Sequence, residues 1–120
     1  MPIHPTAVVD SLADLHPSVE IGPYAIIDGP VRIEQGTVIG PHVHLLGHTS
    51  IGAGCRLHAG VVVGDIPQDR SYAGGESRVV IGHETILREY VTIHRGTKAG
   101  TVTSVGQRCM VMAHAHIGHN

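Results

Sequence analysis

Residues 31–63 read VRIEQGTVIGPHVHLLGHTSIGAGCRLHAGVVV, and within this stretch every sixth residue is Ile, Leu or Val. These aliphatic positions are Ile33, Ile39, Leu45, Ile51, Leu57 and Val63. The same count continues backward to Ile3 and forward to Ile117. Its exceptions are Asp69, Gly75 and Ala99. The residue four positions after each aliphatic is small or β-branched almost throughout, so a six-residue repeat organises the chain.

A period of six matches neither the 3.6-residue turn of an α-helix nor the alternation of an ordinary strand. It matches a coil of short strands joined by tight corners, in which the aliphatic and the small residue of each unit both point inward. β-branched residues suit the flat faces of such a coil, and the glycines that often follow the aliphatics suit its corners. The sequence therefore predicts an all-β parallel solenoid with one narrow core.

The composition limits both the fold and the partners. The chain of 120 residues is predicted to be one domain, residues 1–120, with a net charge of −2 that favours neither nucleic acid nor anionic lipid as a partner. The N-terminus lacks a signal-peptide pattern, and aliphatic runs such as Val61–Val63 are too short to span a bilayer. We therefore expect a cytoplasmic chain without membrane insertion. Phe and Trp are absent, so the core must be built from smaller side chains.

Two segments depart from the repeat. GDIPQDRSYAGGESRVV, between Val63 and Ile81, lacks the inward pattern and contains turn-forming residues, which predicts one projecting loop near residues 65–79. RGTKAGTVTS, which follows His94, predicts a shorter excursion. Both could be insertions that a solenoid tolerates at its corners. Because compact loops of about twelve residues are seldom without a role, we favour a function for the first loop.

Both cysteines, Cys55 and Cys109, occupy the small inward position of the repeat, which predicts that they are core residues. At least two coils separate them, and a spacing of about 4.8 Å per stacked strand makes that distance too long for a disulfide. The chain also lacks a C-x-x-C motif, so neither a redox pair nor a cysteine zinc site is expected.

The last seven residues, HAHIGHN, contain His114, His116 and His119. Because the inward positions fall on Val111 and Ala115, His114 and His116 are expected to share the outward face of a strand, with His119 near a corner. These residues alone leave three interpretations open. The cluster could bind zinc, it could supply a general acid–base histidine, or it could be a solvated histidine face.

The repeat resembles that of the hexapeptide-repeat proteins, whose fold is a left-handed, three-sided parallel β-helix. The left hand follows from the resemblance alone, since the usual crossover rule favours the right hand. The segments QDRSYAGGESRVVIG, LREYVTIHRGT and AHIGHN resemble, in that order and at similar spacings, the bacterial family of UDP-N-acetylglucosamine O-acyltransferases that start lipid A biosynthesis. The resemblance covers the whole chain. It implies an acyltransferase, without a cofactor, that moves an (R)-3-hydroxyacyl group from acyl carrier protein to the glucosamine 3-hydroxyl of UDP-N-acetylglucosamine.

The resemblance also implies a role for particular residues. His119 matches the family's general base, which removes the proton of the sugar hydroxyl as the oxygen attacks the thioester. His116 and His94 match positions that line the nucleotide-sugar site. Gln68 and Asp69 match loop residues that reach the active site, where Asp69 would contact the hydroxyl of the acyl chain. The family's sites lie between the subunits of a homotrimer, and the resemblance implies no metal ligand.

Several positions depart from the family pattern. Ser71 stands where the family has a lysine, with Arg70 beside it as a substitute charge, and His114 stands in place of an asparagine. Asn120 stands where an aspartate usually follows the base. The family continues for more than as long again, through further coils and a helical C-terminal domain. The resemblance therefore implies that this chain corresponds to the N-terminal part, with the backbone donor for the oxyanion beyond Asn120.

Three alternatives remain open from the sequence. A zinc enzyme of the β-helical carbonic anhydrase type would lose metal and activity together when treated with a chelator. A structural β-solenoid would need neither His119 nor the projecting loop for its function. The sister N-acyltransferase of the same pathway would carry an added N-terminal domain before the repeat.

Overall fold

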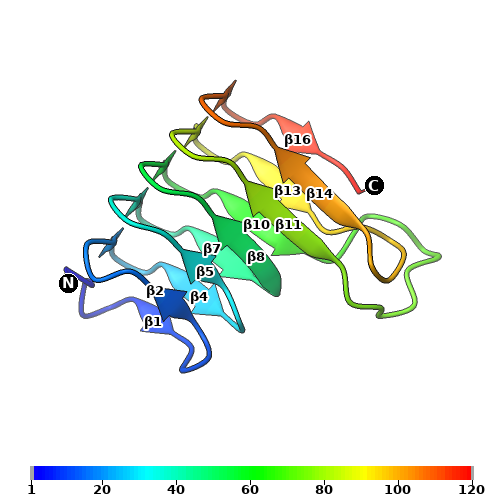
Figure 1. The fold of residues 1–120 in the computed structure, drawn as a ribbon, viewed down its shortest axis with the longest axis horizontal. Helices are drawn as coiled ribbons and strands as arrows, with labels where there is room; N and C mark the ends of the chain where they lie inside the picture. Colours follow the sequence, from blue (N-terminus) through cyan, green and yellow to red (C-terminus); the bar gives the residue numbers. More distant parts are fainter. Residues whose placement is uncertain (1, 120) are drawn as a thin grey trace.

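The computed structural model describes residues 2–119, which wind into a three-sided coil without helices among them. Three parallel sheets form the sides, and the chain passes through them in rotation (Figure 1). The first sheet contains β1 (Val8–Val9), β4 (Ile26–Asp28), β7 (His44–Leu46), β10 (Val62–Asp65), β13 (Thr92–His94) and β16 (His116–Ile117). The second contains β2 (Asp14–Leu15), β5 (Arg32–Ile33), β8 (His48–Ile51), β11 (Arg78–Ile81) and β14 (Val102–Val105). The third contains β3 (Glu20–Ile21), β6 (Val38–Ile39), β9 (Arg56–Leu57), β12 (Ile86–Leu87) and β15 (Met110–Val111).

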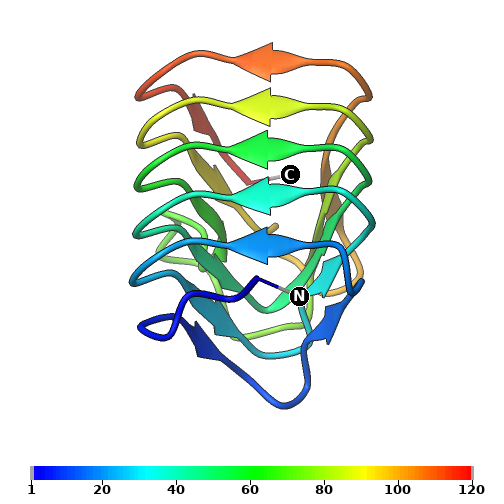
Figure 2. The same cartoon turned by 90° about the vertical axis from the view of Figure 1, so that its left-hand side faces the viewer.

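The strand register measures the length of each coil. Figure 2 looks onto the third sheet, whose strands are stacked one above another. In the regular part Ile26 pairs with His44 and His44 with Val62, so one coil takes three of the six-residue units. Val62 pairs with Thr92, five units further along the chain, and Thr92 pairs with His116, four units further. The first irregular coil is thus longer by two units and the second by one unit, which confirms the two predicted excursions.

The core is a column of aliphatic side chains, as the repeat predicts. Its largest fully buried members include Ile27, Ile33, Ile39, Leu45, Ile51, Leu57, Ile81, Leu87 and Ile93, all from the sixth-residue series. Burying each of these side chains contributes about 1.5–3 kcal/mol. The column is narrow because each six-residue unit contributes one large aliphatic side chain and one smaller residue to it. Small residues at the second inward position, such as Ala25 and Val43, fill the remaining space and are fully buried.

Threonines and cysteines alternate along one buried column of this core. The Thr37 hydroxyl donates to the Gly52 carbonyl at 2.6 Å and accepts from the Cys55 amide at 3.1 Å. Thr85 repeats both bonds, with Gly106 at 2.7 Å and Cys109 at 3.2 Å. Both cysteines are free, and burial raises the pKa of the Cys55 thiol. The prediction that they are inward residues without a disulfide is confirmed, although Cys109 is only partly buried.

The two excursions leave the coil at the same edge and lie side by side (Figure 1). The first runs between Asp65 and Arg78, so it ends slightly before the predicted residue 79, because Val79 is buried within β11. The second joins β13 to β14. Two bonds tie the loops together: Gly100 N–H donates to the Glu76 carbonyl at 2.8 Å, and the Ser77 hydroxyl donates to the Gly96 carbonyl at 2.7 Å. The first loop is therefore held by the second.

Membrane insertion was not expected from the sequence. Among residues 2–119 no helix has the length and apolar character needed to cross a bilayer.

Candidate active site

Asp69, Thr97 and His119 converge from three separate segments of the chain. Asp69 lies in the first loop, Thr97 lies in the second loop, and His119 follows β16. The Thr97 hydroxyl donates to Asp69 Oδ2 at 2.8 Å and lies 3.1 Å from His119 Nδ1. His119 Nε2 is 3.9 Å from the same carboxylate oxygen. The side chains of His119 and Asp69 are 32% and 27% exposed, so the cluster is open to a substrate.

Asp69 is fixed in this cluster by its own loop. Its Oδ1 atom accepts the Ser71 amide at 2.9 Å and the Ser71 hydroxyl at 2.8 Å, the kind of local turn that aspartate side chains favour. These bonds from Ser71, together with the bond from Thr97 and the nearby His119, lower the pKa of Asp69 to about 2. The carboxylate is therefore ionised near neutral pH. Ser71 therefore orients the Asp69 carboxylate.

His94 and His116 form a second pair beside this cluster, on neighbouring strands β13 and β16. Their ring centroids are 4.9 Å apart with the planes at 79°, an edge-to-face contact. His116 Nδ1 also lies 2.8 Å from the Thr92 hydroxyl. His94 is only 8% exposed, and burial, followed by the charge of His116, lowers its pKa. His94 is thus held neutral near pH 7, while its Nδ1 atom is buried without a hydrogen-bond partner among the described residues.

The structure brings together four of the five residues expected at the site. Gln68 is the exception, because its side chain is exposed and makes no hydrogen bond to the described residues of the cluster. Thr97 was missed as a site residue: it falls at an inward position of the repeat, but its hydroxyl contacts Asp69 and His119 instead of entering the core. The repeat carries no signal for this contact, since the excursion has no neighbouring coil to pack against.

The expectation that His114 and His116 share the outward face of one strand is wrong. Strand β16 begins at His116, and His114 lies at the preceding corner with a positive φ of 63°. The His114 ring stacks on Tyr90 with centroids 5.4 Å apart. The chain must turn sharply between two sides of the coil, and this corner conformation removes His114 from the strand face. His114 is therefore a stacked corner residue.

The zinc interpretation gains no support from the side-chain geometry. Across residues 2–119, no three His, Cys, Asp or Glu side chains are arranged to hold a metal ion. His94 and His116 make an edge-to-face contact, and His119 Nδ1 lies 3.1 Å from the Thr97 hydroxyl. This histidine arrangement suits acid–base chemistry better than coordination.

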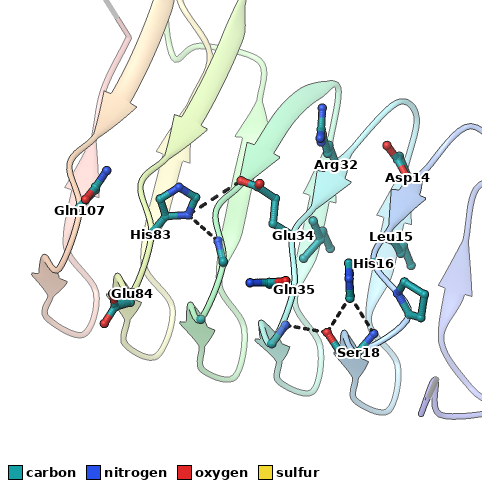
Figure 3. A pocket seen from close by; sticks show the side chains of 15 residues that line it. Asp14, Leu15, His16, Ser18, Arg32, Glu34, Gln35, His83, Glu84 and Gln107 are labelled. Carbon is teal, nitrogen blue, oxygen red and sulfur yellow. Dashed lines mark hydrogen bonds and ion pairs between the residues drawn. The ribbon is translucent and has the colours of Figure 1, made fainter.

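A hollow elsewhere in the molecule contains none of the expected site residues. It has a volume of about 1170 Å³ and is open to solvent between the second and third sheets. Figure 3 shows His83 directed toward Glu34, and His83 Nδ1 accepts the Ala53 amide at 2.8 Å. His83 Nδ1 and Glu34 Oε2 are 3.9 Å apart, which is too long for a hydrogen bond. We take Asp69, Thr97 and His119 as the candidate site, since polar side chains converge there from three segments.

The fold and the cluster define a class. The family described as "Bacterial transferase hexapeptide (six repeats)" matches residues 30–65, which correspond to the strands from β5 to β10. Solved structures of two UDP-N-acetylglucosamine acyltransferases superpose closely on this chain. The Moraxella catarrhalis structure has a TM-score of 0.96 and 38% identity, over 99% of this chain and 47% of its own. The Francisella novicida structure has a TM-score of 0.94 and 41% identity, over 98% and 43%. The predicted left-handed parallel β-helix is confirmed, and the chain is a hexapeptide-repeat protein.

Curated relatives make the assignment narrower. The acyl-[acyl-carrier-protein]–UDP-N-acetylglucosamine O-acyltransferase of Syntrophobacter fumaroxidans is 49% identical over 100% of this chain. The enzyme of the same name from Chlorobaculum parvum is 47% identical over 98%. The chain spans 47% and 45% of the length of these two relatives, which is about half. The chain belongs to the family of UDP-N-acetylglucosamine O-acyltransferases and corresponds to a part of such a protein.

Proposed function

We propose that this chain takes part in transferring an (R)-3-hydroxyacyl group from acyl carrier protein to the glucosamine 3-hydroxyl of UDP-N-acetylglucosamine, the first step of lipid A biosynthesis. The names of the relatives support the substrates. The observation that carries the proposal is the convergence of His119 with Thr97 and Asp69 on an exposed edge of the coil. A fixed, accessible imidazole is what proton removal from a sugar hydroxyl requires.

In the proposed reaction His119 Nε2 takes the proton of the sugar 3-hydroxyl while that oxygen attacks the thioester carbonyl carbon. The carbon–sulfur bond then breaks, and the carrier protein's thiol leaves with the proton that the imidazolium returns. Atoms and charges balance without an acyl-enzyme, so no nucleophilic Ser or Cys is needed. Cys55 cannot serve as a nucleophile in any case, because its thiol is 2% exposed and burial raises its pKa.

The neighbouring histidines are proposed to bind the nucleotide sugar. His94 is held neutral by burial, so it can donate and accept hydrogen bonds without adding charge. His116 stands beside it with an exposed ring. Gln68 and Asp69 would reach the acyl chain from the first loop. We further propose a cytoplasmic homotrimer, in which a neighbouring subunit would cover this open edge.

The direct test is mass spectrometry of UDP-N-acetylglucosamine incubated with this chain and (R)-3-hydroxyacyl carrier proteins of several chain lengths. An O-acylated sugar nucleotide is expected, and His119→Ala should reduce its formation by about 10²–10⁴-fold, the usual contribution of a general base. His114→Ala is the matched control, because this histidine stacks on Tyr90 outside the cluster. Sedimentation analysis of the same samples reports whether they are trimeric. A folded trimer that forms no product would refute catalysis by this chain.

A further inference from the structure

We infer that Thr97 is a positioning residue that fixes the tautomer of His119, with the proton on Nδ1 and the lone pair on Nε2. This inference rests on the proposed function for its importance in turnover, but its structural content does not depend on it. The inference arises from two contacts of a single hydroxyl group, 2.8 Å to Asp69 Oδ2 and 3.1 Å to His119 Nδ1.

The positions of the protons follow from counting donors. A threonine hydroxyl has one proton to donate, and an ionised carboxylate can only accept. The carboxylate of Asp69 is ionised because Ser71 and Thr97 bond to it. The Thr97 proton must therefore point to Asp69, since two acceptors 2.8 Å apart would otherwise repel each other. The remaining contact is then satisfied only if His119 Nδ1 carries a proton and donates it to Thr97.

This arrangement leaves the other ring nitrogen as the base. Nε2 lies 3.9 Å from Asp69 Oδ2, which is too far for a hydrogen bond, so Asp69 does not occupy its lone pair. When Nε2 takes a proton from the sugar hydroxyl, the new positive charge forms beside a carboxylate that is already held in place. Thr97 thus transmits the orientation of Asp69 to the imidazole, and the second loop serves to present that hydroxyl.

The same three residues link both loops to the histidine. Ser71 fixes Asp69 in the first loop, and the bonds from Ser77 to Gly96 and from Gly100 to Glu76 fix the second loop against the first. The Thr97 hydroxyl is therefore placed by backbone contacts on two sides. A residue without a hydroxyl at this position would leave Nδ1 without this acceptor. The contact that favours a proton on Nδ1 would then be lost, and we expect the tautomer that isolated imidazoles favour, with the proton on Nε2.

The test is nitrogen-15 NMR of the imidazole groups in the whole chain, at a pH where His119 is neutral, with His119→Ala to assign its signals. The chemical shifts of the two ring nitrogens distinguish the tautomers directly. The unmodified chain is expected to carry the proton on Nδ1. Thr97→Val should move it to Nε2, and Thr97→Ser should restore it to Nδ1. Thr101→Val is the matched control, since that hydroxyl donates to the Lys98 carbonyl in the same loop.

The result that overturns the inference is a proton on Nε2 in the unmodified chain, or an unchanged tautomer in Thr97→Val. Turnover is a second readout: Thr97→Val should lower kcat by about tenfold or more with little change in KM, because a base presented in the wrong tautomer loses part of its 10²–10⁴-fold contribution. Thr97→Ser should recover most of that loss. Failure of the proposed function is distinguishable, because the tautomer is measured without substrate.

Discussion

The ring of Tyr90 stacks on the ring of His114 from the next coil, with centroids 5.4 Å apart and planes inclined by 11°. Both residues occupy corners with a positive φ, 60° at Tyr90 and 63° at His114. Tyr24 and His42 form an equivalent stack at a centroid distance of 5.3 Å earlier along the coil. Aromatic stacking between successive coils is thus a structural feature of this corner, and it separates His114 from the histidines of the candidate site.

The first prediction concerns this stack. His114→Ala is expected to lower the free energy of unfolding by about 0.5–1.5 kcal/mol, the usual contribution of an aromatic pair beyond its buried area. Acyl transfer should be unchanged, because the ring contacts Tyr90 and not the cluster. Urea denaturation measures the first effect, and a double-mutant cycle with Tyr90→Ala isolates the pair. A large loss of turnover in a stable His114→Ala chain would show that this histidine takes part in the reaction.

A second prediction concerns the buried threonines. Thr37→Val keeps the shape of the side chain but removes partners from the Gly52 carbonyl and the Cys55 amide. Because Thr37 is 0% exposed, the unpaired groups cannot turn to water, and a loss of about 1–3 kcal/mol is expected in urea unfolding. Thr101→Val, on the more exposed second loop, should change stability by less than about 0.5 kcal/mol. Equal effects of the two substitutions would contradict this account of the core column.

The third prediction concerns acid stability. Bonds from the Ser71 amide and hydroxyl, and then from Thr97, lower the pKa of Asp69 from 3.8 to about 2. Folding therefore favours the carboxylate, so its stabilisation is fully present above pH 3.8 and is lost as the pH falls through about 2. Asp69→Asn should flatten the dependence of the urea midpoint on pH in this window. An identical pH dependence in both chains would show that these bonds do not persist in solution.

Glu89 must be tested separately in the same experiment. The bond with Arg88 lowers the pKa of Glu89 to about 2, so this group titrates in an overlapping window. Both carboxylates lie at the surface, but Glu89 depends on a charged partner whereas Asp69 depends on hydroxyl and amide donors. Added salt should therefore weaken the stabilisation by Glu89 more than the stabilisation by Asp69. The urea unfolding of Glu89→Gln and Asp69→Asn with and without salt measures the two contributions.

The fourth prediction compares two glycines with similar backbone angles. Gly64 has a φ of 94° and Gly74 a φ of 84°, so alanine at either position bears the cost of the left-handed region, about 1–2 kcal/mol. At Gly64 the added methyl group would also collide with the Leu46 carbonyl and the Thr49 hydroxyl, whereas at Gly74 it would meet nothing within 4 Å. Gly64→Ala should cost about 1–3 kcal/mol more, the usual penalty for overpacking. Thermal or urea unfolding of the two variants gives the comparison, and similar losses would rule out the collision.

The architecture could be predicted from the sequence because each coil repeats one local rule. Ile27, Leu45 and Ile93 are buried, as the six-residue repeat predicts. The repeat does not predict burial in the two loops, where the chain leaves the three sheets. Ala99 illustrates this failure: it falls at a position of the six-residue count but is exposed, because it lies in the second loop. Periodicity has physical meaning only where another coil lies above or below.

The site was predictable only in part, for a related reason. His119, His116 and His94 lie in or directly after regular strands, so their positions are determined by the coil and their motifs. The contacts of Thr97 depend on the paths of two loops, and Asp69 lies 28 residues before Thr97 in the chain. These contacts are not encoded in a short linear pattern. The corner conformation of His114, in contrast, recurs with the repeat, because Tyr24, His42 and Tyr90 have a positive φ at the same place in their six-residue units.

The excess lengths of the two irregular coils are whole numbers of the six-residue unit, two units in the first and one in the second. The six-residue count therefore continues unchanged across each loop, and Ile81 and Val105 are separated from Ile3 by whole numbers of units. Removing a complete excess would leave every later side chain facing the side it faces now. Removing a fraction of a unit from the wall of a regular coil would turn the aliphatic series that follows out of the core, whereas a projecting loop can change its length without this effect. Within the wall of this fold, an insertion or deletion therefore keeps the inward side chains inward only when its length is a multiple of six.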